Sequence, residues 1–225
     1  MSSRRCSRCG LVNFAEASEC KRCGVQLRAE EMGEAREASD DSDGRPPRSF
    51  LKRLSWVAGM TLVILFVCYL SLLLTSNAIS WEQRRTVERS IGVLEDKGFG
   101  REAFVLRRLV SFRSTDNWWN MQVGHRDAYA ATNFPFEVVT LYPDFFDLAA
   151  DDMERAAILL HEAYHLFGSG ERAALEGVWR NKGRLGWTQE RYARTRVWKN
   201  TRELTESYAP ELFRCGDDGK SDCMQ

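Results

Sequence analysis

The sequence predicts an α+β domain that follows a single membrane-spanning helix and a small N-terminal module held together by four cysteines. Three observations lead to this expectation. Two Cys-x-x-Cys pairs stand near the N-terminus, and an uncharged apolar stretch runs from Leu54 to Leu74. Beyond it, the strand-like segment Phe136–Tyr142 precedes an apolar helical segment, Ala156–Phe167. A short sheet with this helix packed against it is the expected architecture of the C-terminal domain.

The N-terminal module, residues 1–27, has the spacing of a compact tetrahedral metal site. Its two pairs are separated by ten residues, and a glycine follows each pair, as a tight turn requires. The four expected zinc ligands are Cys6, Cys9, Cys20 and Cys23. Four thiolates leave no open coordination position, so this zinc ion is expected to be structural.

With Asn13 between the pairs, the pattern C-x2-C-x3-N-x6-C-x2-C resembles the RanBP2-type zinc ribbon. Members of that family bind single-stranded RNA or ubiquitin, and a Trp two residues before the first Cys belongs to some of those surfaces. This chain has Arg4 at that position. The resemblance therefore implies a ribbon that contacts a cytoplasmic protein partner rather than nucleic acid, although basic side chains around the pairs permit phosphate contact.

The next two segments predict a linker and a membrane anchor. Residues 28–49 are acidic, small and Pro-containing, which is typical of a disordered linker. Residues 51–76 are expected to form a transmembrane helix, because the apolar stretch is long enough to cross a bilayer and begins too late for a cleavable signal peptide. Basic residues precede the stretch and residues 75–81 are uncharged. The positive-inside rule then predicts a single-pass protein with a cytoplasmic N-terminus and an extracytoplasmic C-terminal domain.

Residues 77–225 supply enough sequence and aromatic side chains for one domain. Strand signals mark Phe136–Tyr142, which is β-branched, aromatic and closed by Pro143; an edge strand and a core strand are both compatible with it. The break at Gly183–Trp187 is expected to separate two helices that follow the segment Ala156–Phe167. The remaining expected elements are a helix at Trp81–Lys97, a strand at Ala103–Phe112, and helices at Ala173–Asn181 and Thr188–Leu212.

The most specific motif is H-E-x-x-H-x-x-G-x-x-E, formed by residues 161–171. Residues four apart share one helix face, so His161 and His165 can bind one metal ion, and Glu162 can act as general base on a water molecule. An ordinary helix end is the alternative interpretation. The apolar run before the motif disfavours it, because burying two histidines and a glutamate without a partner would cost several kcal/mol.

A third ligand is expected just after the motif helix. Gly168 and Gly170 are natural stop and turn residues, and they would bring Glu171 back toward the two histidines. The resulting two-His, one-Glu site would bind a catalytic zinc ion with an open fourth position. Other residues remain possible as the third ligand; these are Glu176, Glu190 and His125.

The motif segment resembles the active-site helix of zincin metallopeptidases. Its spacing is similar to that of metzincins, whereas the Glu ligand is similar to that of gluzincins. The resemblance implies a zincin-like domain in which the metal activates water for peptide-bond hydrolysis. It further implies that Glu162 takes the water proton and later passes it to the leaving amine. It also implies a strand near the helix to which substrate peptide adds. Tyr208 is a candidate for an oxyanion-stabilising hydroxyl, although a core role is the more common fate of such an aromatic residue.

The remaining observations bear on compartment and on function. In an oxidising exterior, Cys215 and Cys223 could pair as a disulfide. With 32 basic and 32 acidic residues, net charge indicates no partner. The leading interpretation is a bacterial, membrane-anchored zinc metallopeptidase acting on an unidentified peptide or protein. The alternatives are a catalytically inactive, membrane-tethered binding or signalling protein, and a zinc hydrolase of another bond, such as a cell-wall amide.

Overall fold

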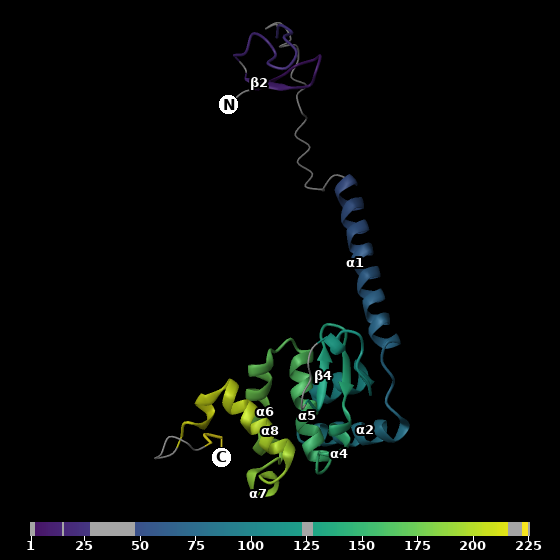
Figure 1. The fold of residues 1–225 in the computed structure, drawn as a ribbon, viewed down its shortest axis with the longest axis vertical. Coiled ribbons are helices and arrows are strands. Elements are labelled where there is room, and N and C mark those ends of the chain that lie inside the picture. Colours follow the sequence, from purple (N-terminus) through teal and green to yellow (C-terminus); the bar gives the residue numbers. More distant parts are fainter. Residues whose placement is uncertain (1–2, 15, 28–47, 123–127, 216–221, 225) are drawn as a thin grey trace. The chain divides into compact units, whose positions relative to one another are not determined.

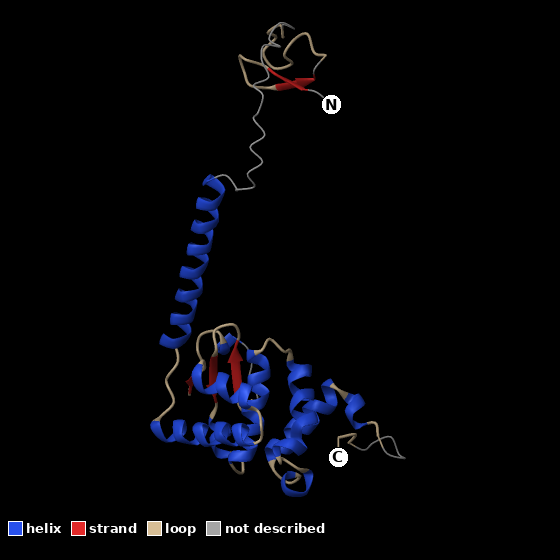
Figure 2. Cartoon of the chain, turned by 180° about the vertical axis from the view of Figure 1, so that it is seen from behind, coloured by secondary structure: helices blue, strands red, loops and turns tan. Residues whose placement is uncertain are grey.

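The computed structural model describes residues 3–14, 16–27, 48–122, 128–215 and 222–224. It divides the chain into two compact units, Met1–Leu54 and Ser55–Gln225, which are described separately below. The structure is mostly helical, with two small sheets, so the α+β class is confirmed (Figures 1 and 2). Residues 28–47 of the expected linker lie outside the described residues.

The first unit contains two short antiparallel strands, β1 (Ser3–Arg5) and β2 (Val12–Phe14). Each Cys-x-x-Cys pair closes with the same backbone pattern. The amide of Cys6 donates to the Leu11 carbonyl and the amide of Cys20 donates to the Val25 carbonyl, both at 2.9 Å. Gly10 and Gly24, which follow the pairs, have φ of 72° and 67°, a conformation that favours glycine.

Helix α1 (Arg48–Leu74) runs from the first unit into the second. Its segment Phe50–Leu74 is long and apolar enough to cross a membrane, and only 6% of its most apolar 18 residues are buried. The last turns are different, because Leu72 is fully buried there and the Tyr69 hydroxyl lies 3.2 Å from the Ser111 hydroxyl. The C-terminal end of α1 therefore packs on the domain that follows it.

That domain is built mainly from helices around one small sheet. Its helices are α2 (Trp81–Asp96), α3 (Gly100–Arg108), α4 (Pro143–Asp147), α5 (Asp152–Leu166), α6 (Glu171–Leu185), α7 (Gln189–Tyr192) and α8 (Arg196–Tyr208). Its strands are β3 (Ser111–Arg113), β4 (Ala130–Asn133) and β5 (Val138–Leu141), and its two 3-10 helices are η1 (Asn120–Gln122) and η2 (Pro210–Phe213).

The strand order identifies the central strand of the sheet and its two edge strands. Its order is β3-β5-β4, with β5 parallel to β3 and antiparallel to β4. Every residue of β5 is buried. The segment Phe136–Tyr142 therefore supplies the central core strand, and β4, which the sequence analysis did not identify, is the edge strand beside α5.

Helix α5 lies at the centre of the domain and packs against α2, α3, α6 and β4 (Figure 1). Close beside it, Trp179, Trp187 and Trp198 form an aromatic cluster with ring centroids 4.7 to 6.3 Å apart. The fully buried Glu154 of α5 accepts hydrogen bonds from the indole of Trp187, the hydroxyl of Thr195 and the amide of Ala150. This buried carboxylate is thus satisfied by three donors that come from different segments.

Three expectations about the local elements were wrong. Ala103–Phe112 forms helix α3 followed by β3, because Ala103 and Leu106 share the buried face of a helix. Gly183 does not end the preceding helix but lies exposed within α6, where a single glycine is tolerated. Thr188–Leu212 is divided into α7, α8 and η2, because Thr195 caps a new helix and accepts a hydrogen bond from the Trp198 amide.

Candidate metal centres and active-site cavity

Helix α5 presents the His-Glu-x-x-His segment as expected. It begins at Asp151, whose side chain accepts hydrogen bonds from the amides of Met153 and Glu154 and caps the helix. The helix continues without interruption through His161 and His165. The Nε2 atoms of these two histidines lie 3.0 Å apart on one helix face.

The turn after α5 fixes both the second histidine and the approach of the third candidate ligand. The amide of Ser169 donates to the Tyr164 carbonyl and the amide of Gly168 donates to the His165 carbonyl, the two bonds of a Schellman motif. Gly168 has φ of 81°, as this motif requires, whereas Gly170 has an ordinary φ of −74°. The predicted turn is therefore confirmed, but only its first glycine uses the conformational freedom of glycine.

This turn also determines which nitrogen of His165 could bind a metal ion. The Ser169 carbonyl oxygen lies 2.9 Å from His165 Nδ1, so Nδ1 is placed to donate its proton there. The Nε2 atom is then left to act as a ligand. A backbone carbonyl on the far ring nitrogen is a common way of orienting metal-binding histidines.

Glu171, the first residue of α6, completes the group. Its carboxylate oxygens lie 3.4 Å from His161 Nε2 and 3.2 Å from His165 Nε2. Ligand atoms bonded to one tetrahedral zinc ion at about 2.0–2.1 Å are separated by about 3.3 Å. Oε1 lies near that distance from His161 and Oε2 from His165, and one ligand atom from each of the three residues lies within 4.8 Å of the others. The structure therefore brings His161, His165 and Glu171 together as a group that could hold a metal ion.

The charges of the group favour a cation. Hydrogen bonds from His161 and His165 hold the pKa of Glu171 far below its usual range. Burial lowers the pKa of His165, but the hydrogen bond to Glu171 and the charge of Glu162 outweigh it and raise that pKa to about 8. The Glu171 carboxylate thus stays ionised, and the negative charge around His165 favours a cation there.

Glu162 lies beside this group but faces the sheet. Its side chain is 5% exposed, and its Oε2 accepts a hydrogen bond of 2.7 Å from the hydroxyl of Thr132 on β4. Thr132 was not predicted from the sequence, since it lies 30 residues away and belongs to a strand that was not identified. The contact fixes the orientation of a buried carboxylate next to the candidate metal ligands.

A cavity of about 530 Å³ opens over the metal-binding group. His161, Glu162, His165 and Glu171 line its polar part, and β4 forms one wall. Apolar side chains line the rest, among them Leu175, Val178, Trp187 and Leu204. The volume is within the range typical of ligand-binding sites, and the few polar groups converge in one part of it.

Two of the other candidates for the third ligand, Glu176 and Glu190, do not join the group. Glu176 forms ion pairs with Arg172 and Arg180, and Glu190 is an exposed residue of α7. His125 lies outside the described residues. Tyr208 is 46% exposed and is not among the cavity-lining residues, whereas Tyr129, which the sequence analysis did not single out, lines the cavity and has its hydroxyl 3.1 Å from the Asn200 side chain.

A buried amide network supports β4 from the side opposite α5. The side chain of Asn133 accepts from Asn117 and donates to Asn120, both at 2.7 Å, and Asn120 donates to the Thr140 hydroxyl at 3.1 Å. All four side chains are buried. The network ties the segment before η1 to the strand that carries Thr132, and its members are too far apart in sequence to form a recognisable motif.

The four cysteines of the N-terminal unit also converge. The Sγ atoms of Cys6 and Cys23 are 3.6 Å apart and those of Cys9 and Cys20 are 3.5 Å apart, close to the roughly 3.8 Å expected around one zinc ion. A backbone hydrogen bond from Arg22 and another from Cys23 lower the pKa of Cys20 to about 6 despite partial desolvation. The cluster could therefore hold a metal ion, as predicted.

Two side chains stabilise this N-terminal unit. Asn13 is 6% exposed and its Oδ1 accepts from the Lys21 amide at 3.1 Å, which joins the two cysteine pairs. Arg4, which occupies the position of the family's Trp, donates to the Leu27 carbonyl at 2.9 Å. Arg4 thus connects the two ends of the cysteine-containing module, residues 1–27.

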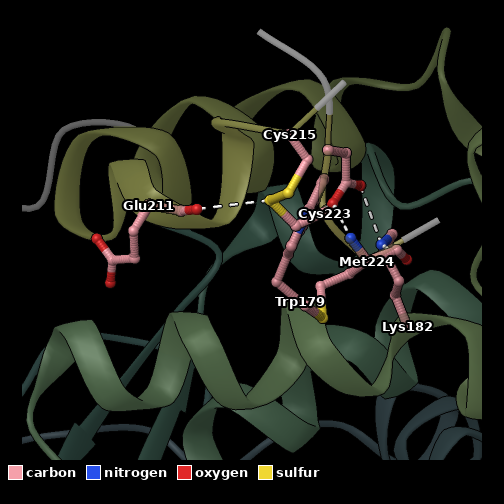
Figure 3. Close-up of a disulfide and its surroundings, with 7 residues drawn as sticks. Trp179, Lys182, Glu211, Cys215, Cys223 and Met224 are labelled. Atoms are coloured by element: carbon pink, nitrogen blue, oxygen red, sulfur yellow. Dashed lines mark hydrogen bonds and ion pairs between the residues drawn. A yellow bond between two sulfur atoms is a disulfide. The ribbon is translucent and has the colours of Figure 1, made fainter. Parts of the chain in front are cut away.

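The C-terminal segment is closed by a disulfide and is fastened to α6 by a buried ion pair. Cys215 and Cys223 are bonded, as the sequence analysis suggested. Figure 3 shows Trp179 and Lys182 projecting from α6 toward this segment. Lys182 Nζ lies 3.0 Å from the buried carboxylate of Asp222, which also accepts from the Trp179 indole at 3.1 Å. The ammonium also donates to the Met224 carbonyl.

Comparison with known proteins adds no assignment. No protein-family model, no curated protein and no solved structure matches the chain. Its function must therefore be inferred from the geometry of its own residues.

Proposed function

We propose that the chain is a membrane-anchored, zinc-dependent peptidase whose active site is the cavity over His161, His165 and Glu171. The observation that supports this best is the convergence of His161, His165 and Glu171. The two histidine Nε2 atoms lie 3.0 Å apart, and the two oxygens of Glu171 lie 3.4 and 3.2 Å from them, one oxygen facing each histidine, beside the buried carboxylate of Glu162. A two-His, one-Glu set with a neighbouring Glu is the donor set of catalytic zinc sites, which keep an open position.

Zinc held by these three residues would polarise the scissile carbonyl and make water more acidic. Glu162 is the proposed general base. With its Oε2 held by Thr132, Oε1 is the oxygen proposed to take the proton of the attacking water and later to return it to the leaving amine. The edge of β4 beside the cavity is the proposed surface for an extended substrate backbone.

The remaining parts of the proposal concern location and partners. The length and exposure of Phe50–Leu74 support a single membrane span. The basic residues before the apolar stretch favour an orientation with the cysteine unit in the cytoplasm and the cavity outside. On the cysteine unit, Val12 and Phe14 of β2 are 52% and 71% exposed. These apolar side chains favour contact with a cytoplasmic protein, while the structural zinc stabilises the unit.

The test of the proposed chemistry is Glu162→Gln in the full-length protein, with Glu176→Gln as the matched control. Both variants neutralise one glutamate, but Glu176 is only ion-paired on the surface of α6. Cleavage of a fluorogenic peptide library should fall by about 100-fold or more in Glu162→Gln, since that is the usual contribution of a general base. Zinc content should stay unchanged in both variants. Undiminished cleavage by Glu162→Gln would refute the mechanism, and zinc binding with no cleavage by any form would favour a tethered binding protein.

A further inference from the structure

An exposed aromatic pair stands where α1 meets the domain. Trp118 and Trp119 are 41% and 44% exposed, and their ring centroids are 5.8 Å apart. Met121, which follows in η1, is 75% exposed, and Leu74, the last residue of α1, is 83% exposed. Large apolar side chains that remain this exposed together indicate a surface with a partner.

Hydrogen bonds fix the position of this surface relative to the end of α1. The indole N–H of Trp118 donates to the Ser71 hydroxyl at 2.9 Å, and its backbone amide lies 3.3 Å from the Thr75 hydroxyl. The Asn77 amide donates to the Thr115 hydroxyl at 2.8 Å. Together with the buried Leu72, these contacts hold the Trp118–Trp119 segment against the last turn of the apolar helix.

The length of α1 gives the depth of that turn. The charged residues Lys52 and Arg53 precede the apolar stretch, which begins at Leu54. An α-helix rises about 1.5 Å per residue, so about 20 residues cross the roughly 30 Å hydrocarbon core of a bilayer. Counted from Leu54, the helix leaves that core near Leu73. Ser71 and Thr75, the two contacts of Trp118, therefore bracket the outer boundary of the hydrocarbon core.

We propose that Trp118, Trp119 and Met121 lie in the outer interfacial layer of the bilayer that α1 is proposed to cross. Tryptophan is enriched in this layer because its ring is apolar and its N–H is polar. The partner of the surface is thus lipid, since the surface continues the end of the membrane helix itself. Removing these side chains from water stabilises one orientation of the domain on the membrane.

The proposed orientation bears on the substrate, in a step that rests on the peptidase function proposed above. Asn117, next to Trp118, donates to Asn133 at 2.7 Å, and Asn133 follows Thr132, which holds Glu162. The interfacial pair is therefore connected to the wall of the cavity through one buried hydrogen bond and two neighbouring residues. The cavity would stay close to the bilayer surface, which favours peptide segments that emerge from, or are tethered to, that surface.

The experiment is quenching of tryptophan fluorescence by brominated phosphatidylcholine, with the full-length protein reconstituted into vesicles. Four forms are compared: wild type, Trp119→Phe, the double variant Trp118→Phe/Trp119→Phe, and Trp56→Phe. The single variant retains the Trp118–Ser71 hydrogen bond, and its circular dichroism and zinc content serve to show that the fold is intact. Subtracting the emission of a variant from that of wild type isolates the indoles removed. Trp56→Phe provides the reference, because Trp56 is 69% exposed within the apolar helix.

The emission lost in the two variants that lack Trp119 should be quenched by brominated lipid nearly as strongly as the emission of Trp56, and only weakly by aqueous iodide. Strong quenching of the Trp118 and Trp119 emission by iodide, without quenching by brominated lipid, would overturn the proposal. If brominated lipid still quenches Trp56 in that case, the membrane span stands and only the interfacial contact is wrong. If neither signal responds to brominated lipid, the span and the contact both fail. None of these results depends on cleavage, so the peptidase function is tested separately.

Discussion

Gly177 of α6 is the position where the packing of α5 against α6 can be tested by one methyl group. A Cβ atom at Gly177 would lie 2.6 Å from Cε2 and 2.9 Å from Cζ of Tyr164 on α5. Gly183 lies in the same helix, and a Cβ there would meet nothing within 4 Å. Gly177→Ala and Gly183→Ala are therefore a matched pair that differ in the contact with α5.

The expected free energies of unfolding follow from two opposing effects. Alanine in place of a helical glycine stabilises by about 0.5–1 kcal/mol, which is all that Gly183→Ala should show. Overpacking against the Tyr164 ring costs about 1–3 kcal/mol, so Gly177→Ala should be neutral or destabilising by up to about 2 kcal/mol. The difference between the two variants, about 1–3 kcal/mol, isolates the contact between α5 and α6.

The same contact controls the distance between the two histidines on α5 and Glu171 at the start of α6. Pushing the helices apart should weaken zinc binding by about 10-fold or more, the usual effect of disturbing groups that support metal ligands. Urea unfolding of the metal-free protein in detergent and competition with a zinc chelator measure the two effects. Equal stabilisation and equal zinc affinity in both alanine variants would refute the packing argument. As a control, in a protein that also carries Tyr164→Ala, Gly177→Ala should again increase the free energy of unfolding, because the clashing ring is gone.

Two further predictions concern the rest of the domain. Reduction of the Cys215–Cys223 disulfide should lower the free energy of unfolding by about 2–3 kcal/mol, as expected for a loop of this length. Cys215→Ser should have the stability of the reduced protein, and adding reductant should not change it. Burial and the hydrogen bond to Asp151 raise the pKa of Tyr192, so its contribution to stability is present below about pH 10 and lost as pH rises through the folded-state pKa. Tyr192→Phe should therefore flatten the alkaline fall of stability in urea titrations, and an unchanged slope would contradict the assignment.

Local spacing accounts for the parts of the site that sequence alone predicted correctly. The motif helix, the turn at Gly168 and the return to Glu171 all lie within residues 161–171, where helix periodicity and glycine conformation largely determine the geometry. The two cysteine pairs are equally local. Setting aside the alternatives Glu176 and Glu190 required the structure, because only the distance of each carboxylate from the histidines distinguishes them from Glu171.

Non-local contacts account for what was missed. Thr132 is recognisable as the partner of Glu162 only once β4 is placed at the sheet edge, and the Asn117–Asn133 contact spans 16 residues. The segment Ala103–Phe112 mixes apolar and basic residues in a pattern compatible with a strand, and its helical start becomes evident from the burial of Ala103 and Leu106. Each of these features depends on which element packs beside which.

The most direct test of the metal site is the zinc content of the purified full-length protein compared with His161→Ala. About two zinc ions per wild-type chain are expected, one in the cysteine cluster and one at His161, His165 and Glu171. The variant should retain one. If the wild-type protein and the variant, both folded, contain the same amount of zinc, His161 does not bind the metal and the proposed catalytic site is wrong.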